Sequence, residues 1–208
     1  MIEAVVSDLG GVVTLPLDQA FRRAHSEIGV PLEALGRAMK LSAERAGEPP
    51  LWTLERGQMR EADFIAGLAS ALSEVLGRPV SLDGYGARLM ASLEPNEPLL
   101  AHYRALRERG VRLAILTNNV REWHDAWRQR LRIDELFELV VDSGFEGTRK
   151  PEPEIYARTL SRLGLPGEAC AFIDDVEVNV TGAREAGMHA IHFRSTEQVI
   201  AELDALVG

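Results

Sequence analysis

The stretch Val5-Val6-Ser7-Asp8-Leu9-Gly10-Gly11 decides the fold of this chain. Residues 2–6 are short, apolar and β-branched, and this pattern predicts a buried strand. The paired glycines end the strand, because glycine permits tight turns and close approach of the backbone. An aspartate at such a place is often only a turn or helix-capping residue. Whether Asp8 does chemistry therefore depends on what the rest of the chain brings near it.

Beyond residue 93, apolar strands and amphipathic helices alternate regularly. The pattern predicts strands over 111–116, 137–141, 169–173 and 190–193. It predicts helices over 97–109, 120–130, 153–163 and 177–186. Strands that alternate with helices of this length pair in parallel through right-handed crossovers. The fold class is therefore predicted to be α/β, with a doubly wound parallel sheet.

The segment between the first strand and this alternating region has a different pattern. Phe64, Leu68 and Leu72 recur at helical spacing, and no strand stands out in this segment. We therefore expect a small helical cap over residues 16–92. The α/β core is expected to comprise residues 1–15 and 93–208.

Composition excludes several classes of protein. The 208 residues are 46% hydrophobic, as in a globular protein, and the net charge is −9. This acidic balance argues against a nucleic-acid partner, whose phosphates need a basic surface. The single cysteine, Cys170, allows no disulfide within the chain. Neither a signal peptide nor an apolar run of membrane-spanning length is recognised, so we expect a cytoplasmic protein with no membrane partner. The sequence does not reveal the oligomeric state, for which we expect a monomer or a homodimer.

Polar residues follow four of the predicted strands. They are Asp8, then Thr117 and Asn118, then Lys150 in a loop, then Asp174 and Asp175. Ligands of parallel sheets bind at the carboxyl ends of the strands. Converging carboxylates repel one another without a cation, and few hard oxygen ligands suit Mg²⁺. Lys150 offers a positive charge for a phosphate group, and a carboxylate can attack phosphorus to give an aspartyl-phosphate.

These four segments resemble the motifs of the haloacid dehalogenase (HAD) superfamily. In this chain the motifs are Asp8-Leu9-Gly10-Gly11-Val12-Val13, Leu116-Thr117-Asn118-Asn119, Arg149-Lys150-Pro151-Glu152-Pro153 and Phe172-Ile173-Asp174-Asp175-Val176-Glu177-Val178-Asn179. Their order and spacing agree with the superfamily over essentially the whole chain. Within it, the chain is most similar to the phosphatase domain of soluble epoxide hydrolases and to bacterial sugar-phosphate phosphatases that begin Asp-Leu-Gly.

The resemblance implies a Mg²⁺-dependent phosphohydrolase that acts on a small phosphorylated substrate. It implies that Asp8 is the nucleophile and that Asp8, the Gly10 carbonyl and Asp175 bind the metal. Thr117 and Asn118 are expected to hold the phosphate. Lys150 is expected to bridge nucleophile and phosphate, and Asp174 and Asn179 to position the nucleophile, Lys150 or metal-bound water. Asn179 is counted with the substrate-binding residues.

One departure from the superfamily pattern concerns Gly10. Most HAD phosphatases have a second aspartate at this position, which protonates the leaving group and later activates water. Loss of such a group typically costs on the order of 10²–10⁴-fold in rate. A substrate with a good leaving group, such as an acyl phosphate or a sugar 1-phosphate, would suffer least. Thr14, Asp18 or a cap residue is a conceivable substitute.

Two other functions stay open at this point. A metal-independent 2-haloacid dehalogenase also lacks the second aspartate, because its nucleophile attacks carbon. The adjacent carboxylates of Asp174 and Asp175 argue against it, since a metal-free site gains nothing from added negative charge. The second alternative is a HAD-fold binding or regulatory protein of low activity, against which the presence of Asp8, Lys150 and Asp175 argues.

Overall fold

A five-stranded parallel sheet forms the centre of the computed structural model, which describes all 208 residues except the side chains of His25 and Glu27. The strands are β1 (Ala4–Ser7), β2 (Arg112–Thr117), β3 (Leu139–Asp142), β4 (Cys170–Asp174) and β5 (His189–His192). Their order in the sheet is β3-β2-β1-β4-β5, and every neighbouring pair is parallel. The predicted doubly wound α/β fold is confirmed.

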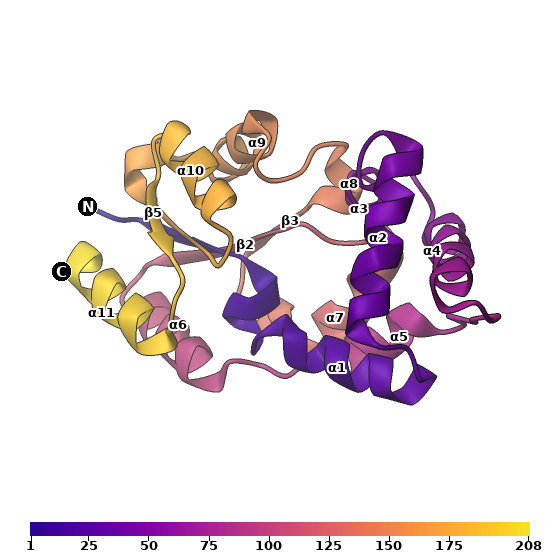
Figure 1. Cartoon of the computed structure of the whole chain (residues 1–208). Coiled ribbons are helices and arrows are strands. Elements are labelled where there is room, and N and C mark those ends of the chain that lie inside the picture. Colours follow the sequence, from indigo (N-terminus) through magenta and orange to yellow (C-terminus); the bar gives the residue numbers. More distant parts are fainter.

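Helices cover both faces of the sheet (Figure 1). Helices α9 (Pro153–Leu163) and α10 (Glu177–Glu185) lie on one face, and α6 (Glu97–Glu108) and α11 (Thr196–Val207) lie on the other. All four residues of β1 are buried, as are all five of β4. This burial on both faces explains why β1 and β4 are mostly apolar rather than alternating.

Five helices form the insert between β1 and β2. They are α1 (Leu17–Ile28), α2 (Leu32–Ala46), α3 (Pro50–Glu55), α4 (Glu61–Leu76) and α5 (Tyr85–Ala91). In Figure 1 they gather beside the carboxyl ends of the strands. The two connections between insert and core run side by side, because Thr14 and Pro95 form an antiparallel bridge and Asn96 N–H donates to the Val13 carbonyl at 2.8 Å.

Most predicted elements occur within one or two residues of their expected positions, but three details differ. The predicted helix over 120–130 is a short 3₁₀ turn, Arg121–Trp123, followed by α7 (His124–Leu131). A four-residue helix, α8 (Ser143–Glu146), follows β3. Helix α11 was not predicted, although Ser195 and Gln198 form a capping box at its start, which is a readable sequence signal.

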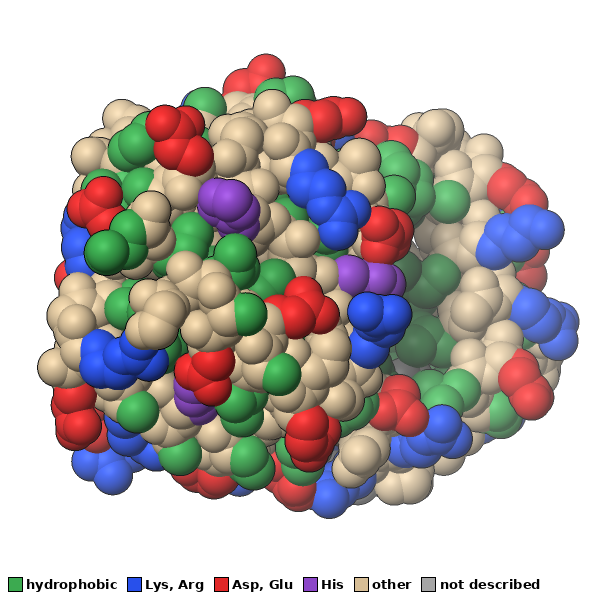
Figure 2. All heavy atoms as spheres, turned by 90° about the vertical axis from the view of Figure 1, so that its left-hand side faces the viewer, with side chains coloured by type: hydrophobic (Ala, Val, Ile, Leu, Met, Phe, Trp, Pro, Cys, Tyr) green, Lys and Arg blue, Asp and Glu red, His purple; other side chains and the backbone are tan. Residues whose placement is uncertain are grey.

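The surface is mixed in charge. Figure 2 shows acidic and basic side chains interspersed over one face, with a recess at its right in which hydrophobic side chains are visible. Within the described part of the chain, no helix combines the length and apolar character that crossing a bilayer requires.

Candidate active site

Lys150 is the centre of the polar cluster at the carboxyl ends of the strands. Its side chain is 1% exposed, and its ammonium lies 2.6 Å from Asp8 Oδ1 and 2.6 Å from Asp174 Oδ2. The ammonium also donates to the Leu116 carbonyl at 2.8 Å. These three acceptors use all three donors of the ammonium group, so its position is fixed from β1, β2 and β4 together.

Three carboxylates converge beside this lysine. Asp8, Asp174 and Asp175 can each place one oxygen within 4.8 Å of the others. Burial, supported by the charges of Asp174 and Asp175, outweighs the opposing charge of Lys150 and raises the pKa of Asp8 to about 7. Burial alone would lower the pKa of Lys150, but the two carboxylates outweigh it and raise this pKa. When all three carboxylates are ionised, the cluster carries more negative charge than its one lysine balances.

A divalent cation fits this donor set. The carboxylate oxygens are hard ligands, and a surplus of negative charge at a cavity wall is what a Mg²⁺ ion would neutralise. Gly11 lets Asp175 approach the turn after β1. Its φ is +80°, and a Cβ there would lie 2.6 Å from Asp175 Oδ2. Any side chain at this position would push Asp175 away from Asp8.

Asp174 and Asn179 form the buried support of the cluster. Asp174 is wholly buried, and its Oδ1 accepts hydrogen bonds from the Val176 N–H at 2.9 Å and from Asn179 Nδ2 at 3.0 Å. Its other oxygen, Oδ2, binds Lys150. The structure thus gives the Asn179 side chain a positioning contact with Asp174, although it also lines the cavity where substrate was expected.

The Asn118 side chain makes contacts that the sequence did not reveal. Its Nδ2 donates to the Lys150 carbonyl at 3.0 Å, and its Oδ1 accepts from the Lys150 N–H at 2.8 Å. These two bonds tie the end of β2 to the loop that carries Lys150, next to the cis peptide bond between Lys150 and Pro151. Thr117, at the end of the same strand, is buried at the floor of the cavity.

Gly10 lines the same cavity and faces a leucine of the cap. A Cβ built on Gly10 would lie 2.7 Å from Leu17 Cδ1, at the start of α1. The φ of Gly10 is −76°, so its backbone conformation is open to any residue. The place where an acid–base side chain would stand is therefore filled by an apolar one.

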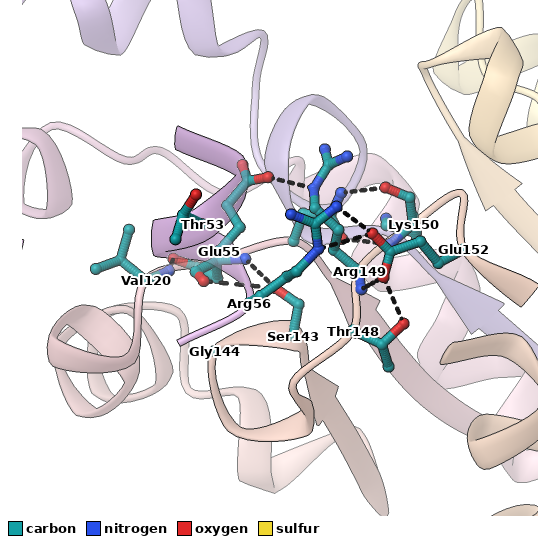
Figure 3. Close-up of polar contacts among 12 residues, drawn as sticks. Thr53, Glu55, Arg56, Val120, Ser143, Gly144, Thr148, Arg149, Lys150 and Glu152 are labelled. Atoms are coloured by element: carbon teal, nitrogen blue, oxygen red, sulfur yellow. Dashed lines mark hydrogen bonds and ion pairs between the residues drawn. The ribbon is translucent and has the colours of Figure 1, made fainter. Parts of the chain in front are cut away.

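Two ion pairs of opposite polarity join the cap to the loop around Lys150 (Figure 3). Glu55, the last residue of α3, accepts from Arg149 Nε at 2.7 Å. Arg56, the next residue, donates from Nε to Glu152 Oε1 at 2.8 Å. The Arg149 guanidinium also lies 5.2 Å from the centre of the Trp52 ring. These contacts were not predicted, because their partners are about a hundred residues apart and belong to no shared motif.

Core and cap together enclose a cavity of about 920 Å³. Its core wall contains seven predicted site residues, namely Asp8, Gly10, Thr117, Asn118, Lys150, Asp175 and Asn179. Asp174 lies behind this wall and reaches the site through Lys150. The structure thus brings all the predicted residues together at one place.

The chain belongs to the haloacid dehalogenase-like hydrolases, because the sequence model of that family matches residues 2–187. Mouse bifunctional epoxide hydrolase 2 is 27% identical over 97% of this chain, and the match covers 38% of that protein. Glyceraldehyde 3-phosphate phosphatase of Pyrococcus abyssi is 36% identical over 43% of this chain and 38% of its own length. The chain therefore matches less than two fifths of each of these relatives.

A solved structure supports the same fold. A HAD family enzyme from Bacteroides thetaiotaomicron, in complex with magnesium and inorganic phosphate, has a TM-score of 0.65 and 22% sequence identity. The match covers 93% of this chain and 95% of that one. The family, the fold and the carboxylate cluster identify the protein as a HAD-type hydrolase.

Proposed function

We propose that this hydrolase is a Mg²⁺-dependent phosphohydrolase that acts on a small phosphorylated metabolite through an aspartyl-phosphate on Asp8. The observation that carries the proposal is the Lys150 ammonium, which is fixed 2.6 Å from the carboxylates of both Asp8 and Asp174 at a cavity wall. A fixed cation beside a carboxylate nucleophile suits an anionic substrate whose charge must be neutralised during transfer.

Each side chain of the site has a separate role in the proposed reaction. A carboxylate oxygen of Asp8 attacks phosphorus, and Lys150 holds that carboxylate and attracts the phosphoryl oxygens. Thr117 and Asn118 at the end of β2 face the phosphate. Mg²⁺, held by Asp8, Asp175 and the Gly10 carbonyl, would neutralise charge on the transferring group.

The remaining residues and the cap have supporting roles. Asn179 positions Asp174, which in turn holds Lys150, and its place in the cavity wall supports its assignment to the substrate-binding residues. We assign catalysis to a core of residues 1–15 and 93–208. Selection of substrate is assigned to a cap of residues 16–92, because that segment builds the wall opposite the carboxylates.

The proposal is tested by phosphate release from acetyl phosphate with and without Mg²⁺. We expect release that requires Mg²⁺ and falls by on the order of 10³-fold or more in Asp8→Asn, because an amide is a poor nucleophile. Asp18→Asn is the matched control, since Asp18 is an exposed residue of α1 paired with Arg22. Release unaffected by Asp8→Asn would refute the proposal, and halide release from a 2-haloacid without metal would replace it with the dehalogenase.

A further inference from the structure

The cap wall of the cavity is almost entirely apolar. Four cap helices, α1, α2, α4 and α5, each turn an apolar face toward the carboxylate cluster. Side chains that build this wall include Phe21, Leu35, Met39, Phe64, Leu68 and Leu89. Cavities of this kind bind apolar ligand groups, because each buried methylene contributes about 0.8 kcal/mol.

The charged side chains of the cap wall are already paired. Among the cavity-lining residues that the structure describes, the cap contributes two charged side chains, Glu55 and Arg56. Each is bound to a residue of the core, Glu55 to Arg149 and Arg56 to Glu152. A sugar or other polyhydroxyl group in this space would exchange its hydrogen bonds to water for contacts with carbon.

Neither Thr14 nor Asp18, the two residues that the sequence suggested as replacements for the missing aspartate, is placed to donate a proton near Gly10. The Thr14 hydroxyl donates to the Leu15 carbonyl and accepts from the Gly11 N–H, both at 3.0 Å. Asp18 pairs with Arg22 at the exposed surface and does not line the cavity.

Two further groups of the cap wall can carry a proton, Glu55 and Tyr85. Burial raises the pKa of Glu55, but Arg149 donates a hydrogen bond to this side chain and stabilises its ionised form, which cannot donate a proton. Burial raises the pKa of Tyr85 to about 12, which weakens it as a proton donor. Together with Leu17 at the place of the missing aspartate, these observations describe a leaving-group site without general acid catalysis.

We propose that the substrate joins an apolar organic group to phosphate through an oxygen of low pKa, as in an aryl phosphate or a fatty acyl phosphate. This inference rests on the phosphohydrolase function proposed above. Asp8 forms a bond to phosphorus while the bond from phosphorus to the leaving oxygen breaks. The electron pair departs with that oxygen as a phenolate or carboxylate, which needs no proton to leave.

Water completes the reaction. It attacks phosphorus of the aspartyl-phosphate, the bond to Asp8 breaks, and the electron pair returns to the carboxylate. The products are inorganic phosphate and a proton released to solvent. Because kcat/KM reports the steps up to departure of the leaving group, it measures the selection of substrate even where this second step is slow.

The apolar half of the inference is tested with straight-chain acyl phosphates from acetyl to octanoyl. Their leaving groups are alike in acidity, so only the apolar length changes along the series. We expect kcat/KM to rise about fourfold for each added methylene until the cavity is filled. A flat or falling series would overturn the apolar assignment.

A pair of adjacent variants locates the effect. Met39→Gln places an amide of similar length in the cavity wall and should flatten the dependence on chain length while acetyl phosphate is still hydrolysed. Lys40→Gln makes the same replacement at a side chain that is 80% exposed and should leave the series unchanged. Equal behaviour of the two variants would show that the apolar chain does not lie against α2.

The leaving-group half is tested with substituted phenyl phosphates of similar size and with decyl phosphate, an alkyl ester. We expect kcat/KM to fall steadily as the pKa of the phenol rises, and to be lower by on the order of 10²–10⁴-fold for decyl phosphate than for the best aryl ester. Equal values for aryl and alkyl esters would overturn this half.

The double variant Gly10→Asp, Leu17→Ala provides the matched test, since it adds an acid and removes the side chain in its way. It should raise kcat/KM for decyl phosphate relative to kcat/KM for the aryl esters, and the ratio between the two is the quantity to measure. The single variant Gly10→Asp should gain less, because its Cβ meets Leu17. A double variant that raises aryl and alkyl esters equally would contradict the inference.

The same probes separate failure of the inference from failure of the proposed function. One outcome is Mg²⁺-dependent phosphate release from acetyl phosphate together with equal kcat/KM for glycerol phosphate, decyl phosphate and the aryl phosphates. This outcome would support the phosphohydrolase function and refute the inference about the substrate. No phosphate release from any probe would refute both.

Discussion

The core wall and the cap wall of the cavity differ in chemistry and in how the chain builds them. The core wall places Asp8, Lys150 and Asp175 at the ends of parallel strands and in the loop between them. The cap wall is made mostly of apolar side chains, which come from all five cap helices and share no motif. This difference supports the proposal that the polar wall carries the reaction and the apolar wall selects the substrate.

The two walls are connected at one place. Arg149 and Glu152, on either side of Lys150, are bound by the consecutive cap residues Glu55 and Arg56. Figure 3 shows both ion pairs reaching from α3 to the loop of Lys150. The orientation of the cap and the position of Lys150 are therefore coupled through these two ion pairs. Substitutions in each wall and in these ion pairs test whether the two walls have different roles.

The largest effect is expected from Lys150→Met in the core wall. Removal of the ammonium leaves Asp8 and Asp174 buried without their shared cation, and breaking a buried pair costs about 3–5 kcal/mol. Urea unfolding without metal should show this loss, and added Mg²⁺ should restore part of it while activity stays lower by on the order of 10³-fold. Lys40→Met, at an exposed site, is the control. Wild-type stability in Lys150→Met would contradict the assigned role of this ion pair.

An intermediate effect is expected where the walls meet. The Glu55 and Arg149 side chains are 13% and 14% exposed, so a double-mutant cycle of Glu55→Gln and Arg149→Gln should give a coupling free energy of about 1–2 kcal/mol in unfolding experiments. The comparison pair Arg45–Glu74 lies within the cap and is more than half exposed on both sides. Its cycle should give about 0–0.5 kcal/mol. Similar values for both pairs would mean that the connection adds no stability beyond a surface ion pair.

The smallest effect concerns the pH dependence of the second pair. Partial burial opposes ionisation of Glu152, but hydrogen bonds from Arg56, Thr148 and the Arg149 N–H together outweigh it and lower its pKa. A carboxylate with a pKa lower in the folded state than its ordinary 4.5 stabilises the protein above that pH. This contribution is lost as the pH falls through the folded-state pKa.

Unfolding free energies of the wild type and Glu152→Gln therefore should differ by about 1 kcal/mol at pH 7. The difference should shrink as the pH falls below about 4.5. Glu154→Gln, at an exposed position of α9, is the control for the loss of stability that the whole protein shows at low pH. A difference that grows toward low pH would contradict the lowered pKa.

Much of the core could be predicted from the sequence because its signals are local. Most strands are short apolar runs, most of the polar site residues stand at or just after the end of a strand, and parallel strands end at one edge of the sheet. Asp8, Thr117 and Asp174 were therefore expected together before any contact was known. The strand pattern does not extend to α11, whose sequence signal is the capping box formed by Ser195 and Gln198 at its start.

The cap could be predicted only as a set of helices. Periodicity shows that Phe64 and Leu68 share a helix face, but it does not show whether that face packs against another helix or lines a cavity. The ion-pair partners of Glu55 and Arg56 could not be predicted either. They lie about a hundred positions away in the sequence, so each ion pair depends on how the cap packs against the core.

The sequence by itself determined the class of fold, the hydrolase family and the residues gathered at the carboxylate cluster, because parallel strands joined by helical crossovers end at one edge of the sheet. The tertiary structure alone decided that Asn118 holds the Lys150 backbone, that Leu17 fills the space beside Gly10 and that the wall opposite Asp8 is apolar. These features arise from side chains that meet across elements, and the distances between such side chains are fixed only when the helices and the sheet pack against one another.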